Sequence, residues 1–176
     1  MSKYDRFQKF PRRAKITDTL TRPDDTTQYT AGDMIADSAS APTANVLAGA
    51  AISNGRGGTI RAITLIDSAK LTTAGDFEIW FFDSAYTLAN DNAAFAPTDA
   101  VAKKAQAIVS LPGSGSIVGN AGADAAGNRV YQKTDIDKDF KCASGSKDLW
   151  WALVVRNAYT PVSAEEFTLI VDVEQN

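Results

Sequence analysis

The chain has 176 residues and a net charge of −3, with 44% hydrophobic and 22% charged residues, which fits one globular domain. It contains no histidine, so a serine–histidine–aspartate triad, a cysteine–histidine pair and a histidine-ligated metal are excluded within the chain. It contains one cysteine, Cys142, so an internal disulfide and a cysteine-rich zinc site are excluded too, and no apolar run approaches the roughly 18 residues of a membrane helix.

The first 15 residues are strongly basic. They carry a net charge of +5, whereas the rest of the chain carries −8. We interpret residues 1–15 as an extended arm that docks on a neighbouring protein subunit, with aromatic residues as anchors and cations as steering groups. A solvated terminus is the alternative, and nucleic-acid binding is a weaker one because the body is acidic. The residues assigned to the arm interface are Lys3, Tyr4, Arg6, Phe7, Phe10, Arg12 and Arg13.

Residues 16–176 are predicted to form one all-β domain. Of the 21 acidic residues 17 are aspartate, which favours turns, and apolar residues alternate with polar ones in most segments. We expect a single two-sheet β-sandwich that is jelly-roll-like. The predicted strands are Lys15–Thr21, Asp33–Ala36, Asn45–Ala50, Thr59–Asp67, Asp76–Asp83, Ala107–Leu111, Asn128–Lys133, Leu149–Val155 and Phe167–Val173.

Three segments depart from simple alternation. Leu149–Val155 is apolar on both faces, which is typical of a central strand that is covered on both sides. Residues from about Pro97 to Lys104 are predicted to form a short helix with Thr98 as its N-cap. Gly113–Asn128 is rich in glycine, alanine and serine and is predicted to be an exposed loop.

One acidic segment has the spacing that opens a calcium loop. Asp135, Asp137 and Asp139 alternate along the chain, but Phe140 and Ser146 stand where an EF-hand needs a glycine and an acidic ligand. A solvated strand face is therefore the preferred interpretation, with a weakly bound cation as the alternative. No metal, cofactor or catalytic site is predicted.

Tryptophans are the remaining candidates for an interface. Trp80, Trp150 and Trp151 either complete a core, form a subunit contact or provide a ligand platform. Because Trp150 and Trp151 are adjacent in a predicted strand, they must point to opposite faces. Cys142 is predicted to be a small buried hydrophobic residue.

A set of segments, taken in chain order, carries a resemblance to known proteins: Thr17–Pro23, Thr27–Asp33, Gly57–Ile60, Phe77–Phe82, Asn90–Phe95, Leu149–Val155, Asn157–Pro161 and Glu174–Asn176. Together they resemble a family of short virion structural proteins of tailed bacteriophages. The resemblance covers most of residues 17–176 but not the basic arm, and no single segment is specific. It implies a non-enzymatic structural protein of the particle, such as a head cement or decoration protein, and it transfers no catalytic residue.

We therefore expect a capsid cement protein of the phage head that is made in the host cytoplasm. Its partners would be the major capsid protein and further copies of itself, in a homotrimer, with no membrane contact. A carbohydrate-binding module of the tail is the second hypothesis, and a β-sandwich glycan lyase or hydrolase that relies on tyrosines is the weakest.

Overall fold

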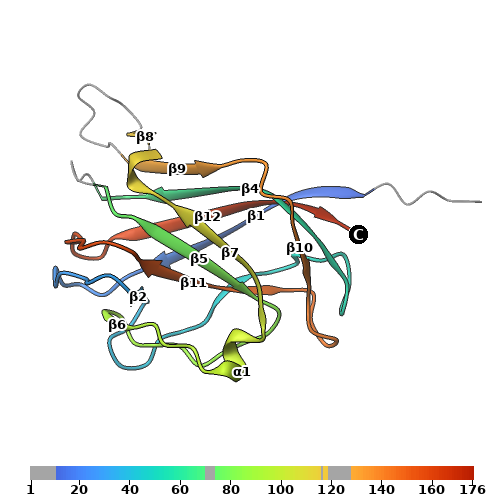
Figure 1. The fold of residues 1–176 in the computed structure, drawn as a ribbon, viewed down its shortest axis with the longest axis horizontal. Helices are drawn as coiled ribbons and strands as arrows, with labels where there is room; N and C mark the ends of the chain where they lie inside the picture. The colour runs from blue at the N-terminus through green and yellow to red at the C-terminus, as the bar shows by residue number, and fades with distance from the viewer. Residues whose placement is uncertain (1–10, 70–73, 116, 119–127) are drawn as a thin grey trace, which may run out of the picture.

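The computed structural model describes residues 11–69, 74–115, 117–118 and 128–176, and strands dominate it (Figure 1). The predicted all-β class is confirmed. The elements in chain order are β1 (Arg12–Thr21), β2 (Asp33–Ile35), β3 (Asn45–Leu47), β4 (Gly57–Asp67), β5 (Phe77–Phe82), β6 (Ala93–Ala94), α1 (Asp99–Ala102), β7 (Ala105–Leu111), a 3₁₀ turn (Gly113–Gly115), β8 (Ile117–Val118), β9 (Arg129–Lys133), β10 (Lys138–Lys141), β11 (Leu149–Val155) and β12 (Glu166–Gln175).

The strands form two antiparallel sheets. The first sheet has the order β1-β12-β4-β9-β8, with β10 also paired to β4. The second has the order β6-β2-β11-β5-β7, with β3 also paired to β11. In Figure 1 the first sheet lies above the second. The chain changes sheet repeatedly, and the first and last strands are neighbours, which is the arrangement of a jelly roll.

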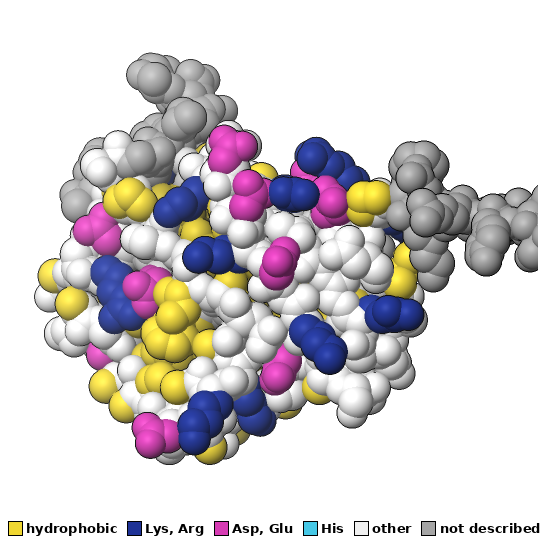
Figure 2. All heavy atoms as spheres, turned by 45° about the vertical axis from the view of Figure 1, so that its right-hand side comes forward, with side chains coloured by type: hydrophobic (Ala, Val, Ile, Leu, Met, Phe, Trp, Pro, Cys, Tyr) yellow, Lys and Arg dark blue, Asp and Glu magenta, His cyan; other side chains and the backbone are white. Residues whose placement is uncertain are grey.

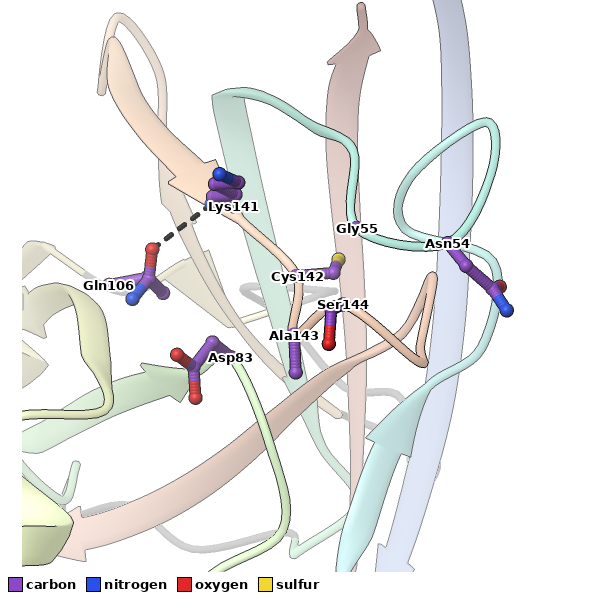
Figure 3. A pocket seen from close by; sticks show the side chains of 8 residues that line it. All are labelled: Asn54, Gly55, Asp83, Gln106, Lys141, Cys142, Ala143 and Ser144. Carbon is purple, nitrogen blue, oxygen red and sulfur yellow. Dashed lines mark hydrogen bonds between the residues drawn. The ribbon is translucent and has the colours of Figure 1, made fainter.

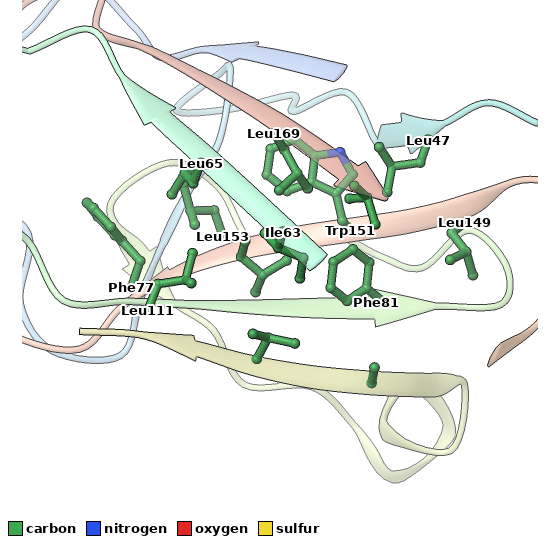
Figure 4. Close-up of a cluster of buried hydrophobic side chains, with 14 of the residues drawn as sticks. Leu47, Ile63, Leu65, Phe77, Phe81, Leu111, Leu149, Trp151, Leu153 and Leu169 are labelled. Atoms are coloured by element: carbon green, nitrogen blue, oxygen red, sulfur yellow. The ribbon is translucent and has the colours of Figure 1, made fainter. Parts of the chain in front are cut away.

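The main core lies between the sheets (Figure 4). Alternation places every second residue of each strand there, as the sequence predicts for β5 and β12. Phe77 makes edge-to-face contacts with Tyr131, Tyr159 and Phe167, so β5, β9, β12 and the 156–165 loop meet around one ring. These buried aromatic residues hold the two sheets together at this end.

A second apolar cluster covers the outer face of the second sheet. Its buried members include Met34, Phe82, Tyr86 and Ala152, and the segment between β5 and β7 supplies Tyr86. The side chains of β11 are therefore buried on both faces, apart from Trp150, which is half-buried. The prediction that Leu149–Val155 is a central, doubly covered strand is confirmed.

Several boundaries differ from those predicted. Helix α1 is only four residues long, although Thr98 caps it as expected and accepts a bond from the Val101 N–H. Strands β6 and β8 were not expected, and β8 falls inside the predicted Gly113–Asn128 loop. The strand expected near Asp135–Asp139 is present only in part, because β10 begins at Lys138, and Asp135 and Asp137 have a left-handed backbone with φ of 55° and 47°. β10 lies against Gly57 and Gly58, where an added Cβ would collide with neighbouring carbonyl oxygens. Glycine at both positions leaves room for β10 beside β4. The alternation of apolar and polar residues does not predict this close approach.

Candidate functional site

Among the described strands, β1 is at the edge of the first sheet and pairs only with β12. Its even-numbered side chains turn toward the interior, and its odd-numbered side chains are exposed on the outer face of the sheet. Two basic residues on that face lie opposite acids of β12, since Arg13 faces Glu174 and Lys15 faces Asp172. The Glu174 carboxylate bonds to Arg61 at 2.9 Å, so the charges of β1 and β12 lie near one another without an ion pair between these two described strands.

The boundary of the predicted arm is therefore corrected. The strand begins at Arg12, so residues 12–15 belong to the sandwich and not to an arm that ends at Lys15. Arg12 and Arg13 are exposed on this strand. The other predicted arm residues lie outside the described part of the chain, namely Lys3, Tyr4, Arg6, Phe7 and Phe10.

The register of β1 against β12 determines which backbone N–H and C=O groups of β1 point toward β12 and which point away from it. The Arg22 N–H donates to the Glu165 carbonyl at 3.0 Å, and this pair continues the β1–β12 register. In an antiparallel ladder, pairs that exchange hydrogen bonds alternate with pairs that do not. The even-numbered residues of β1 therefore bond to β12, while the odd-numbered residues direct N–H and C=O away from it. Among the described residues, no hydrogen bond reaches these outward groups.

The outward-facing residues of β1 form what we call the open edge, defined as Arg13, Lys15, Thr17, Thr19 and Thr21. The sequence prediction assigned a role to Arg13 but missed the three threonines. The available signal was the Thr-x-Thr-x-Thr alternation in the first strand, because it places polar, β-branched side chains on one exposed face.

The three tryptophans lie in two different environments. Trp151 is 0% exposed in the main core, and its Nε1–H donates to the Asp18 carboxylate at 2.8 Å. It therefore cannot form a contact at the surface of the folded subunit, which corrects its place among the interface candidates. Trp80 and Trp150 are half-buried and pack against the second cluster, on the opposite face of the sheet from Trp151.

Trp80 lies beside an exposed part of the second sheet. Its Nε1–H donates to Glu78 at 2.6 Å, and Glu78 also pairs with Arg156. Its cross-strand neighbour on β7, Ile108, is 45% exposed. Figure 2 shows a contiguous hydrophobic area bordered by basic and acidic side chains. Trp80 and Ile108 thus provide aromatic and aliphatic surface on the second sheet.

A cavity of about 600 Å³ opens near the start of β7 (Figure 3). Gln106 spans it and accepts a hydrogen bond from the Lys141 backbone N–H at 3.0 Å. Asp83 is the single carboxylate among the described residues that line it, so it offers no pair of acids for hydrolysis. Cys142 is buried as predicted, and burial raises the pKa of its thiol to about 11. The thiol is therefore protonated at neutral pH and a poor nucleophile.

The three carboxylates of the 135–139 segment do not form a cluster, because each has a different partner. Asp137 pairs with Arg61, Asp139 accepts from the Thr59 hydroxyl at 2.7 Å, and Asp135 accepts from its neighbour Thr134. No cluster of acids, histidine or cysteine suited to a metal ion occurs within the described ranges. The segment is a polar surface with local partners.

A buried polar network joins the end of β1 to two loops. Arg22 is 2% exposed, and its Nε donates to the Tyr29 hydroxyl at 2.9 Å. Tyr29 donates in turn to Asp91 at 2.6 Å, and Asp91 also accepts from the Ala36 N–H. Burial and the bond to Asp91 raise the pKa of Tyr29 above its usual value, so the phenol stays neutral. The network fixes the loops that follow β1.

A second network lies where β4 ends and β12 begins. Asp67 and Glu165 are each 1% exposed and hydrogen-bonded to one another. The Tyr159 hydroxyl donates to Glu165 and lies 3.4 Å from the Asp67 carboxylate. Burial, followed by the contact with Asp67, raises the pKa of Glu165 to about 9. Burial raises the pKa of Asp67 as well. We infer that the two carboxyl groups share one proton at neutral pH.

Neither a family model nor a curated protein matches this sequence. Among solved structures, a Cocksfoot mottle virus structure is similar over 94% of this chain and 95% of that chain, with 12% identity and a TM-score of 0.33. A black queen cell virus structure matches over 99% and 74%, with 13% identity and a TM-score of 0.28.

The K3 cleaved adhesin domain of Lys-gingipain from Porphyromonas gingivalis matches over 81% of this chain and 74% of that chain. Its identity is 13% and its TM-score is 0.29. Similarity at this level transfers no function to the chain. No helix in the described part of the chain is long and apolar enough to span a membrane.

Proposed function

We propose that this protein is a non-enzymatic structural protein of a bacteriophage virion, and specifically a cement protein that binds the assembled head. The observation that carries the proposal is the position of the basic residues at the start of β1. Arg12, Arg13 and Lys15 are exposed on an edge strand of a rigid sandwich. The predicted basic arm is joined in sequence to this strand, and we assign the contact with a neighbouring subunit to the arm and to these exposed cations.

The resemblance of the ordered segments to phage virion proteins supports the same role. Stabilisation would follow from mass action, because a ligand that binds only the assembled shell stabilises it by RT ln(1 + [L]/Kd) at each site. Several symmetric copies would add avidity to modest single contacts. The partner is the major capsid protein, and acidic patches on it would complement the basic segment.

Removal of residues 1–11 is expected to abolish or strongly weaken decoration of the shell while the body stays folded. The truncation ends just before Arg12, so the β1–β12 pairing is kept. The measurement is co-sedimentation with shells assembled from the cognate major capsid protein, which gives the stoichiometry at saturation. The melting temperature of the truncated protein tests the fold. Equal decoration by the truncated protein would contradict the proposal.

A matched pair of charge variants sharpens the test. Arg12→Gln combined with Arg13→Gln removes two cations from the edge, whereas Lys103→Gln combined with Lys138→Gln removes two exposed cations elsewhere. We expect the first pair to reduce decoration and to steepen its loss with added salt. The second pair should behave as the wild type.

A second candidate function is a carbohydrate-binding module of the tail. The half-buried Trp80 beside the exposed Ile108 favours it, because aromatic surface on a sheet can stack on sugars. A titration with host-surface glycans, read by tryptophan fluorescence, tests this alternative. A saturable change that Trp80→Ala removes would support it, and the absence of any change would contradict it.

A further inference from the structure

The open edge of β1 is a template for another strand. Its five residues direct N–H and C=O groups outward, and within the described part of the chain these groups have no partner. Such an edge pairs with a further strand unless something blocks it. No proline occurs in β1, and its register with β12 runs without a bulge. The β7 edge of the second sheet is different, because the Lys133 ammonium of β9 donates to the Ser110 carbonyl of β7 across the gap between the sheets.

The inward-facing charge of the strand does not obstruct pairing. An unpaired charge that points inward is one way in which edge strands avoid association. The Asp18 carboxylate, however, accepts from the Val46 N–H at 2.9 Å and from the Trp151 Nε1–H at 2.8 Å. It is thus held by the second sheet of its own subunit.

We propose that β1 pairs antiparallel with β1 of a second copy, across a two-fold axis at Thr17. The two first sheets would then form one continuous sheet. This inference is independent of the proposed cement function, because it uses only described residues and needs no capsid.

The register is selected by side-chain chemistry. Pairing about Thr17 places Arg13 opposite Thr21 of the second copy and Lys15 opposite Thr19, with every open-edge group matched. Pairing about Lys15 would place two ammonium groups opposite each other, which is unfavourable. Pairing about Thr19 would place Lys15 opposite Pro23, which has no N–H to donate. The Thr17 register offers about ten hydrogen bonds between the copies.

Charge and packing favour a second copy as the occupant. The basic half of each strand would run beside the end of the other strand, where Asp24 and Glu166 are exposed. Ala14 and Ile16 pack against the main core but remain only partly buried. A strand beside β1 would cover both of them, which adds apolar burial to the hydrogen bonds.

The test is the solution mass of three proteins by sedimentation equilibrium. We expect the wild type at twice the 18.7 kDa mass of one chain. Thr17→Pro should sediment at the mass of a single chain. Its N–H points away from β12, so proline removes a bond to the second copy but none within the subunit. Thr17→Val keeps the N–H and the branched side chain and should remain dimeric.

Hydrogen exchange of the wild type gives a second measurement that needs no variant. The amides of Lys15, Thr17 and Thr19 should exchange slowly at high protein concentration and fast on dilution. The amides of Asp18 and Leu20, which bond to β12, should stay protected throughout.

Three results would overturn the inference. The first is a wild type that is monomeric at every concentration. The second is a wild type that is trimeric, as the resemblance to virion proteins suggests. The third is a Thr17→Pro variant that is still dimeric. The protein without residues 1–11 should still dimerise. A dimer that fails to decorate shells would therefore count against the cement function and leave the β1 pairing standing.

Discussion

Replacing Asp91 with alanine is expected to lower the free energy of unfolding by about 3 kcal/mol, the lower end of the cost of breaking a buried ion pair. The change removes the acceptor of the Tyr29 hydroxyl and the Ala36 N–H, and one of the two carboxylates that pair with Arg22. In a domain of this size, such a loss corresponds to a melting temperature lower by roughly 6–12 °C. Thermal or urea unfolding followed by circular dichroism measures it.

Two further variants distinguish the loss of this hydrogen-bond network from the general effect of removing an acidic side chain on stability. Asp99→Ala removes an exposed aspartate of α1 and should change stability by less than about 0.5 kcal/mol. Arg22→Met combined with Asp91→Leu removes both charges and should regain part of the stability lost in Asp91→Ala. If Asp91→Ala and Asp99→Ala were equally stable, the network would have no energetic role.

Glu165→Gln is expected to remove a large part of the pH dependence of stability. Glu165 has a pKa of about 9 in the folded protein, against an ordinary value of 4.5. A raised pKa contributes stability that is complete below the unfolded value and is lost as the pH rises through the folded value. The wild type should therefore become less stable between about pH 5 and pH 9, by at most about 1.4 kcal/mol per pH unit from one proton.

Glutamine cannot ionise, and its amide can still donate to Asp67. The variant should therefore show a flatter pH profile than the wild type and should be the more stable of the two near pH 9. The groups that face the pair are Tyr159, Tyr131 and Arg129, and all of them are retained. The control is Glu166→Gln, at the adjacent but exposed glutamate, which should keep the wild-type profile. Identical profiles for all three proteins would contradict the shared proton.

The sandwich could be predicted from the sequence because its strands are half-buried. Phe77, Ile79 and Phe81 alternate with outward residues, and the same pattern in β12 marks the buried face. The adjacent pair Trp150 and Trp151 indicated that β11 has two covered faces. Periodicity needs only the identity of neighbouring residues, so it gives the strands and their inward faces directly.

The polar networks and the open edge could not be predicted in the same way. Arg22, Asp91 and Glu165 are far apart in the sequence, and burial of each depends on loops that alternation does not place. The open edge depends on which strand is outermost in the sheet, and that is a property of topology. The boundary of the basic arm was misplaced because the acids that pair with β1 lie more than 150 residues away.

The position of β12 between β1 and β4 has a consequence for synthesis on the ribosome. Residues 12–21 emerge early, yet their hydrogen-bonding partner is residues 166–175. β1 therefore cannot pair with β12 until almost the whole domain has been translated. Long-range pairing of this kind slows folding. During that interval an exposed strand from another nascent chain could pair with β1, so crowded polysomes would favour contacts between chains.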